Sequence, residues 1–406
     1  MTSTESTDVL IIGGGVAGAS AAKTLREGGH DGRIVLLTRE LDAPYHRPPG
    51  SKEHLRGEAS RDDALVVPEG WWAEHDVDLR LRSGVLSLDA AEKTAKLQTK
   101  DVISFDRALL ATGAMVRRLP VDGTGLEGLH YLRSLRNAEV IKADIDGVGP
   151  GARVVLVGGS YIGCEVAASL ASQGHPVTVL MQEDEPLQRT FGTEVGGWVR
   201  RRLEREGIEI RGGVEVSAFV PKDPEEPKGR VGGVALADGT TVEGDVVVIG
   251  VGAQPDVMLA KRAGLALGES GGILCDDRLR TSAAGIWAAG DCAEYDSVLH
   301  GERVRIEHED VAEQQGAFVA RQWLGADEAY AEVPYFFSDL ADWVSLESVT
   351  VGRDFDSVRI DGSLEDDAFA VWLLKGDRPL GYASFNGAGD LDRGREILKA
   401  GGPVPS

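Results

Sequence analysis

The sequence predicts an α/β protein with two doubly wound parallel sheets, followed by a C-terminal α+β domain with an antiparallel sheet. Three observations support this prediction. A short apolar run, a glycine-rich turn and a helical stretch occur in that order at the start of the chain, and the same order recurs from residue 153. The two turns begin at Gly13 and Gly158, 145 residues apart, which is far enough for two separate domains. From about residue 327, segments rich in aromatic residues alternate with a period near two, as in an antiparallel sheet.

The first repeat reads DVLIIGGGVAG at residues 8–18. Its apolar run, Val9–Ile12, is typical of a parallel strand that is buried on both faces. The turn occupies residues 13–18, and an alanine-rich helix is expected to continue to about Glu27. A second strand, Arg33–Leu37, completes a strand–helix–strand unit.

The second repeat begins RVVLVGGSYIGCE at residues 153–165. We expect a strand at Val154–Val157, the turn at 158–163, a helix at Cys164–Gln173 and the next strand at Pro176–Leu180. Because each copy has its own strand, turn, helix and second strand, the sequence predicts two Rossmann-like domains rather than one.

Other segments predict further strands, a loop and a helix. Arg107–Gly113 and Asp245–Gly252 read as strands that run into small-residue turns, and Gly285–Cys292 reads as a third strand ending in Gly-Asp. Residues 221–229, PKDPEEPKG, predict a surface hairpin loop. A helix is expected near Leu391–Lys399, after the antiparallel strands.

These segments divide the chain into three predicted domains. Residues 1–117 and 251–326 form the first, residues 118–250 the second, and residues 327–406 the third. The length of 406 residues and a hydrophobic content of 42% are sufficient for cores of this size.

The chain is strongly acidic, with a formal net charge of -23. Binding of nucleic-acid phosphates needs clustered Lys and Arg, so the charge argues against nucleic acid as a partner. The N-terminus lacks the basic and apolar regions of a signal peptide, and no apolar run approaches the ~18 residues of a membrane helix. We therefore expect a cytoplasmic protein without a membrane span.

The cysteines are few and widely spaced: Cys164, Cys275 and Cys292. None belongs to a C-x-x-C or similar close pair, which argues against a zinc site and against a local redox disulfide. We predict no metal site, and the sparse cysteines are typical of a reducing compartment.

Each glycine-rich turn can place the backbone close to a pyrophosphate, which the N–H groups and positive dipole end of the following helix then stabilise. Close packing of strand and helix can select the same glycines without any ligand. With two complete units, the sequence predicts that the chain holds two dinucleotides at once, one to donate a hydride and one to receive it.

Several unlinked motifs occur in one order along nearly the whole chain. They are PYHRPPGSKE at 44–53, ATG at 111–113, YLRSL at 131–135, GGSYIGCE at 158–165, GDC at 290–292, RIEHED at 305–310 and FFSDL at 336–340. On these motifs the sequence resembles the FAD-dependent pyridine nucleotide oxidoreductases, especially their ferredoxin-reductase-like and apoptosis-inducing-factor-like members. The resemblance implies a glutathione-reductase-like fold, FAD at the first turn and NADH at the second.

The resemblance also implies a set of cofactor-binding positions. They are Gly13, Gly15, Ala17, Gly18, Arg39, Glu40, Arg47, Lys52, Val85, Ala111, Thr112, Gly113, Arg133, Gly158, Gly159, Tyr161, Ile162, Gly163, Glu183, Arg189, Gly252, Gly290, Asp291, Glu307, His308, Glu309 and Phe337. For Val85, burial in a core strand is an equally good explanation. Asp291 also suits a helix N-cap.

Lys52 and Glu165 are the candidate catalytic residues, since in similar enzymes this pair meets beside flavin N5. A lysine ammonium there stabilises electron density arriving on the isoalloxazine, and a carboxylate holds the ammonium in place. The plain alternative is a surface lysine and a glutamate favoured by the N-terminal dipole of a helix.

Three positions depart from the family pattern. Arg39 stands where similar proteins carry an acid for the FAD adenosine ribose; either Glu40 takes over this role or Arg39 faces solvent. Gly50 replaces the usual leucine of P-P-L-S-K, which could loosen that loop. Phe337 replaces a tryptophan, and core packing is the alternative explanation for it.

The function implied is an NADH-dependent FAD flavoprotein reductase whose acceptor is a small iron–sulfur protein, ferredoxin or rubredoxin. Glu183 after the strand PVTVL favours NADH over NADPH, and Arg189 is a second candidate contact. The alternative is an apoptosis-inducing-factor-like NADH dehydrogenase or oxidase, or a redox-sensing flavoprotein, using quinone or oxygen. The oligomeric state stays open, and a homodimer is compatible with the sequence.

Overall fold

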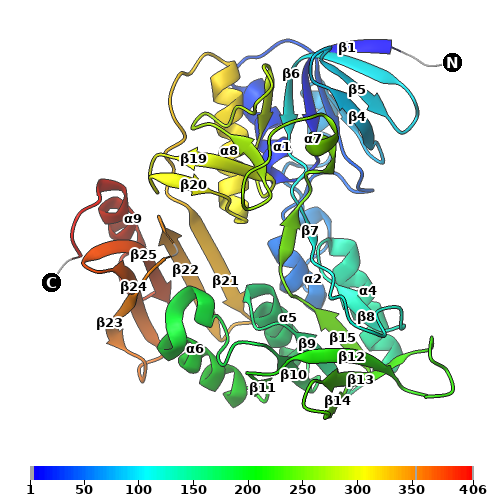
Figure 1. The fold of residues 1–406 in the computed structure, drawn as a ribbon, viewed down its shortest axis with the longest axis vertical. Helices are drawn as coiled ribbons and strands as arrows, with labels where there is room; N and C mark the ends of the chain where they lie inside the picture. Colours follow the sequence, from blue (N-terminus) through cyan, green and yellow to red (C-terminus); the bar gives the residue numbers. More distant parts are fainter. Residues whose placement is uncertain (1–3, 353, 405–406) are drawn as a thin grey trace. The chain divides into compact units, whose positions relative to one another are not determined.

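The computed structural model describes residues 4–352 and 354–404, which fall into two compact units (Figure 1). Unit 1 comprises the described residues of Met1–His46, Asp62–Met115 and Gln254–Phe336. Unit 2 comprises those of Arg47–Arg61, Val116–Ala253 and Phe337–Ser406. Each unit is therefore assembled from segments that are far apart in the sequence.

Unit 1 is organised around a sheet with the strand order β3-β2-β1-β6-β5-β4. The β3, β2, β1 and β6 strands are parallel, whereas β4 and β5 form an antiparallel ribbon on the first half of β6. The second half of β6 pairs in parallel with β18. The strands of this sheet are β1 (Thr4–Ile12), β2 (Ile34–Leu37), β3 (Val77–Arg80), β4 (Val85–Asp89), β5 (Thr94–Leu97), β6 (Val102–Leu110) and β18 (Ile286–Ala288).

Two long helices of unit 1, α1 (Val16–Glu27) and α8 (Glu309–Trp323), pack closely against each other (Figure 1). Gly316 permits this approach, because a Cβ atom there would lie 2.0 Å from the carbonyl oxygen of Ala17. The unit also contains a small sheet of order β17-β19-β20. Its remaining elements are α3 (Trp71–Glu74), α7 (Met258–Arg262), β17 (Ile273–Cys275), β19 (Ala293–Ser297), β20 (Glu302–Val304) and a 3₁₀ turn at Asp62–Ala64.

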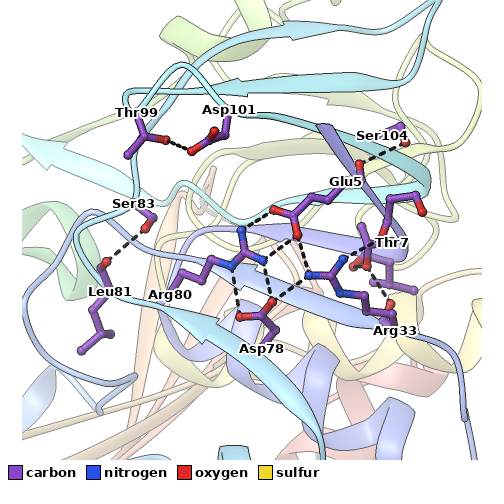
Figure 2. Close-up of polar contacts among 12 residues, drawn as sticks. Glu5, Thr7, Arg33, Asp78, Arg80, Leu81, Ser83, Thr99, Asp101 and Ser104 are labelled. Atoms are coloured by element: carbon purple, nitrogen blue, oxygen red, sulfur yellow. Dashed lines mark hydrogen bonds and ion pairs between the residues drawn. The ribbon is translucent and has the colours of Figure 1, made fainter. Parts of the chain in front are cut away.

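An ion-pair network joins the neighbouring strands β1, β2 and β3 of unit 1 (Figure 2). Arg33, just before β2, lies 2.6 Å from Glu5 of β1 and 3.0 Å from Asp78 of β3. Arg80 of β3 lies 2.5 Å from Glu5 and 2.6 Å from Asp78. Two cations and two anions thus alternate around a closed ring, which we call the Glu5–Arg80 network.

Unit 2 contains an all-parallel sheet of order β11-β10-β9-β15-β8. A three-stranded antiparallel sheet of order β12-β13-β14 belongs to the same unit. The elements are η1 (Pro48–Ser51), α2 (Glu53–Arg56), β8 (Leu129–Tyr131), α4 (Leu135–Val148), β9 (Val154–Val157), α5 (Tyr161–Ser172), β10 (Val177–Leu180), α6 (Gln188–Arg205), β11 (Glu209–Arg211), β12 (Val216–Pro221), β13 (Val231–Leu236), β14 (Thr241–Glu243) and β15 (Val246–Ile249).

The C-terminal sheet has the order β21-β22-β25-β24-β23 and is followed by α9. Its core continues that of α6, since Phe191 and Trp198 of α6 pack edge-on against Phe385, with centroids 5.4 and 5.5 Å apart. Phe369 stacks on Phe385 at 4.6 Å, so four rings form one buried cluster. The elements are β21 (Tyr335–Leu340), β22 (Val344–Thr350), β23 (Ser357–Ser363), β24 (Ala368–Lys375), β25 (Arg378–Phe385) and α9 (Leu391–Ala400).

Two further short strands, β7 (Ala114–Val116) and β16 (Ala253–Pro255), pair with each other in a two-stranded sheet where the chain passes from one unit to the other.

Within residues 4–352 and 354–404, no helix combines the length and hydrophobicity that a membrane crossing requires.

The main predicted elements are confirmed. Both strand–turn–helix–strand repeats are present, and the hairpin loop at 221–229 joins β12 to β13. The C-terminal strands are antiparallel, and a helix covers residues 391–400. Several boundaries differ: β1 begins at Thr4 rather than Val9, and β6 at Val102 rather than Arg107. The helix α5 begins at Tyr161 rather than Cys164, because it starts directly after the N-cap Ser160.

Candidate active site

The first glycine-rich turn links β1 to α1 in unit 1. Gly13 has φ +129°, and a Cβ atom there would lie 2.0 Å from the carbonyl oxygen of Ala111 after β6. A Cβ atom at Gly18 would lie 2.1 Å from the carbonyl oxygen of Gly13. Gly15 is the N-cap residue of α1 and has open space around it, so no side chain covers the backbone N–H groups there. The turn therefore needs glycine for packing at its first and last positions and leaves its middle open to a ligand.

The second turn, between β9 and α5 in unit 2, repeats this geometry. Gly158 has φ +120°, and a Cβ atom there would lie 2.3 Å from the carbonyl oxygen of Gly250, after β15. A Cβ atom at Gly163 would lie 2.0 Å from the carbonyl oxygen of Gly158. Ser160 takes the place of Gly15, and its hydroxyl accepts no capping hydrogen bond from the backbone N–H groups of α5. Gly159 faces Met181, whose sulfur would lie 2.2 Å from a Cβ atom there.

Both turns lie at the carboxyl end of a central strand of a parallel sheet, where doubly wound folds bind nucleotides. The N-termini of α1 and α5 present backbone N–H groups that no side chain caps. Each turn therefore fits the pyrophosphate of one dinucleotide.

Predicted residues Thr112 and Gly113 form the turn that follows β6. The Thr112 hydroxyl donates to the carbonyl oxygen of Asp256 at 2.6 Å, and the Asp256 N–H donates to the carbonyl oxygen of Gly113 at 2.8 Å. Asp256 is buried, and apart from its place after a short strand nothing in the sequence indicated a role for it.

Gly290 and Asp291 follow β18, as predicted. Gly290 has φ +78°, and its N–H donates to the side-chain oxygen of the buried Gln315 at 2.8 Å. The alternative role of Asp291 as a helix N-cap is wrong, because a turn and then β19 follow it rather than a helix. Gln315 was not expected; its only signal is a polar residue on the buried face of α8.

Residues around the start of α8 form a second polar group in unit 1. His46 Nδ1 lies 2.9 Å from Glu309 Oε1, and this hydrogen bond raises the pKa of His46 above its usual 6.5. Arg305 pairs with Glu307 at 2.5 Å, and the His308 ring lies 4.9 Å from that of Phe336. Of the predicted positions 307–309, Glu309 therefore meets His46, which was not singled out.

Arg39 and Glu40, which follow β2, each contact another side chain. The Arg39 side chain is 63% exposed, yet its Nη2 lies 2.5 Å from Asp256 Oδ2. Glu40 accepts a hydrogen bond from the Tyr45 hydroxyl at 2.6 Å. Val85, in β4, is partly buried against the core of unit 1, in agreement with its alternative explanation.

In unit 2, the predicted Glu183 lies in the loop after β10, and Arg189 lies at the start of α6. Arg189 Nε forms an ion pair with Glu183 Oε1, and the Arg189 side chain is 78% exposed. Gly252 has φ +96° with open space around it. Beside the turn, Ile162 is exposed, and the Tyr161 ring meets that of Phe191 edge-on at 6.3 Å.

The other predicted FAD positions Arg47, Lys52, Arg133 and Phe337 lie in unit 2, whereas the first turn lies in unit 1. Arg47 Nη1 donates to the carbonyl oxygen of Arg133 at 2.7 Å. Gly50 is buried, and a Cβ atom there would make an ordinary 3.6 Å contact with Leu135, so the loop at 48–51 is packed rather than loose.

Lys52 and Glu165 meet in a buried group that we call the Lys52 cluster. Lys52 Nζ lies 3.7 Å from Glu165 Oε1, 3.2 Å from Asp339 Oδ2 and 4.1 Å from the centroid of the Phe337 ring. The side chains of Lys52 and Glu165 are only 6% and 4% exposed. The alternative of a surface lysine is therefore wrong. Phe337 is itself 36% exposed, so core packing does not explain it either.

Two hydroxyls complete the Lys52 cluster. Ser51 Oγ donates to Glu165 Oε2 at 2.5 Å, and Ser338 Oγ donates to Glu165 Oε1 at 2.6 Å. Burial raises the pKa of Glu165, while the Lys52 ammonium and the two hydroxyls oppose this rise. Ser51, Ser338 and Asp339 were not among the predicted site residues, although all three lie within the GSKE or FFSDL motif.

The three cysteines are buried and free. Burial raises the pKa of Cys164 to about 12, so its thiolate is scarce at neutral pH. Burial also raises the pKa of Cys275 and Cys292. None has the character of a redox-active thiol.

Comparison with known proteins agrees with this geometry. Residues 7–316 match the family model described as pyridine nucleotide-disulphide oxidoreductase. The chain is 33% identical over 397 residues to rhodocoxin reductase of Rhodococcus erythropolis, covering 98% of this chain and 90% of that one. It is 31% identical over 378 residues to rubredoxin-NAD(+) reductase of Pseudomonas putida, covering 93% and 95%.

Among solved structures, a ferredoxin reductase of Rhodopseudomonas palustris superimposes with a TM-score of 0.92 at 33% identity, covering 98% of this chain and 95% of that one. The fold and the two turns define an enzyme class that binds two nucleotides. The chain belongs to the pyridine nucleotide-disulphide oxidoreductase family.

Proposed function

We propose that the protein is a flavoprotein reductase that takes electrons from NADH through FAD to a small iron–sulfur protein, ferredoxin or rubredoxin. The observation that carries this proposal is the shared geometry of the two turns, each at the carboxyl end of its own parallel sheet. The names of the relatives, reductases of rhodocoxin, rubredoxin and ferredoxin, support the choice of acceptor. When bound, FAD supplies a hydride acceptor that can release electrons one at a time.

In this proposal the FAD domain comprises residues 1–117 and 251–326, the NAD(H) domain residues 118–250, and the C-terminal domain residues 327–406. The first turn, the Thr112-Gly113 turn and Asp291 hold FAD. We place the enzyme in the cytoplasm, since its three free cysteines suit a reducing compartment.

NADH binds at the second turn, and the proposed contact for its adenosine ribose is Glu183. A carboxylate accepts hydrogen bonds from ribose hydroxyls and repels a 2′-phosphate. Arg189 would favour a 2′-phosphate by itself, but its ion pair with Glu183 offsets that charge. NADH is therefore the preferred donor over NADPH.

The proposed catalytic residues are Lys52 and Glu165. The Lys52 ammonium is held by Glu165 and Asp339 and lies over the Phe337 ring, which leaves it few alternative positions. A positive charge fixed in this way can stabilise the negative charge that develops when the flavin is reduced. Removing such a group typically slows the chemical step by about 10²–10³-fold.

Rapid-mixing absorbance measurements on the purified flavoprotein test the proposal. NADH should bleach the flavin band faster than NADPH at equal concentration. Cytochrome c reduction in the steady state should then depend on added ferredoxin or rubredoxin. Fast turnover with quinone or oxygen alone would favour an NADH dehydrogenase or oxidase of the apoptosis-inducing-factor type. Flavin reduction without turnover on any acceptor would favour a redox sensor, and faster reduction by NADPH would contradict the role of Glu183.

A further inference from the structure

The residue after the end of β2 in unit 1 is basic, where dinucleotide-binding folds usually have an acid. In dinucleotide-binding folds, an Asp or Glu about 20 residues after the glycine-rich turn, at the end of the second strand, accepts a hydrogen bond from the adenosine ribose. Here β2 ends at Leu37, and Thr38, Arg39 and Glu40 follow. A basic residue thus stands where the acid is expected.

The neighbouring acid, Glu40, is bound elsewhere. Its carboxylate accepts the Tyr45 hydroxyl at 2.6 Å, and its backbone N–H donates to Thr38 Oγ1 at 3.1 Å. Glu40 is therefore held toward the loop that carries Tyr45.

A different acid, Asp256, contacts Arg39 at the end of β2, although 217 residues separate the two in the sequence. Its Oδ2 lies 2.5 Å from Arg39 Nη2. The Asp256 side chain is only 8% exposed. Among the described residues, none forms a hydrogen bond or ion pair with its other oxygen, Oδ1. This carboxylate oxygen is therefore available to accept a hydrogen bond from a ligand.

The backbone fixes Asp256 beside the first turn. Its N–H and carbonyl oxygen bond to Gly113 and Thr112, which follow β6. Arg39 follows β2, and both strands pair with β1, whose end begins the glycine-rich turn at Gly13. The Arg39–Asp256 pair thus joins the segments that follow the two strands on either side of β1.

The charges of the pair select the ligand group. Arg39 alone would favour a 2′-phosphate at this position. Asp256 offsets the charge of Arg39 at 2.5 Å and would repel a phosphate. The site is therefore suited to a neutral group that can donate an O–H hydrogen bond.

We propose that Asp256 accepts a hydrogen bond from the adenosine ribose of FAD, in place of the acid that the end of β2 lacks. Arg39 is a positioning residue that orients the carboxylate. The inference rests on the proposed function in so far as the first turn binds FAD.

The test compares the binding of FAD with that of FMN, which lacks the adenosine. Both are titrated into the apoprotein, and quenching of flavin fluorescence gives the two dissociation constants. Asp256→Asn should weaken FAD binding by about 10–100-fold, as expected for a hydrogen bond to a charged group. FMN binding should not change. Asp106→Asn, the matched control at an exposed acid of β6, should leave the ratio of the two constants as in the wild type.

A second arm uses the wild-type chain and an FAD analogue whose adenosine ribose lacks both hydroxyls. The analogue should bind the wild type more weakly than FAD does, but bind Asp256→Asn about as well as FAD does. An unchanged FAD-to-FMN ratio in Asp256→Asn, or equal wild-type affinities for FAD and the analogue, would overturn the inference. A wild-type chain that binds no flavin at all would instead refute the proposed function.

Discussion

Replacement of Lys52 by methionine should destabilise the protein in a pH-dependent way. Methionine fills the space of the aliphatic stem but leaves the Glu165 carboxylate, only 4% exposed, without its cation. Removing one partner of a buried ion pair commonly costs about 3–5 kcal/mol. Here two hydroxyls still donate to the carboxylate, and Asp339 is 41% exposed, so it can be solvated once Lys52 is gone.

We therefore expect a loss of about 2–4 kcal/mol at pH 8, which corresponds to a fall in melting temperature of about 5–15 °C for a domain of this size. The sign of the pH dependence follows from Glu165. Burial already raises the pKa of Glu165, and losing Lys52 removes the main opposing effect. The folded variant then binds a proton more tightly than the unfolded chain, so its stability falls as pH rises through the folded-state pKa.

Thermal unfolding followed by circular dichroism at pH 5.5 and pH 8 measures this difference. The gap between Lys52→Met and the wild type should be smaller at pH 5.5. Adding Glu165→Gln to Lys52→Met should recover stability to within about 1 kcal/mol of the wild type, since an apolar and a neutral polar residue then share the site. An equal loss at both pH values, or no recovery in the double variant, would refute the charge-pair argument.

Three further outcomes are expected. His46→Gln should lower the free energy of unfolding by about 0.5–1 kcal/mol at pH 6 and hardly at all at pH 9, which melting curves at the two pH values measure. The reason is that Glu309 raises the pKa of His46, so the stabilisation is present below pH 6.5 and is lost as the pH rises. Arg80→Ala should lower the free energy of unfolding by about 1 kcal/mol at pH 7 and by progressively less below pH 4.5. Hydrogen bonds from Arg80 lower the pKa of Glu5 and Asp78, and the stabilisation is lost as these carboxylates are protonated. Melting curves from pH 7 to pH 3 measure the difference. A thiol reagent should find no fast-reacting cysteine in the native protein and three after denaturation, and a fast native thiol would contradict their burial.

Much of the fold could be predicted from the sequence because its signals are local. The apolar run, the turn and the helix of each repeat lie within about 20 consecutive residues, so periodicity and glycine placement are enough to locate them. The structure adds the reason for the individual glycines: Gly13 and Gly158 lie against the carbonyl oxygens of Ala111 and Gly250, contacts made with a neighbouring strand.

The candidate site could be predicted only in part. Lys52 and Glu165 were paired by motif resemblance alone, since 113 residues separate them and neither carries a local sign of burial. Their hydroxyl donors Ser51 and Ser338 were missed. A serine beside a lysine or an aspartate is common on protein surfaces, and only packing shows that it faces a buried carboxylate.

The sequence by itself determined the two nucleotide-binding units and the class of chemistry, since glycine spacing and hydrophobic periodicity act over a few turns of chain. Only the tertiary structure decided which acid meets Arg39 and which groups surround Lys52. Asp256 is 217 residues from Arg39, and the Lys52 cluster draws on three separate segments. Contacts of this kind depend on strand order and on the direction of each side chain, which are fixed only when the whole sheet and its helices pack together.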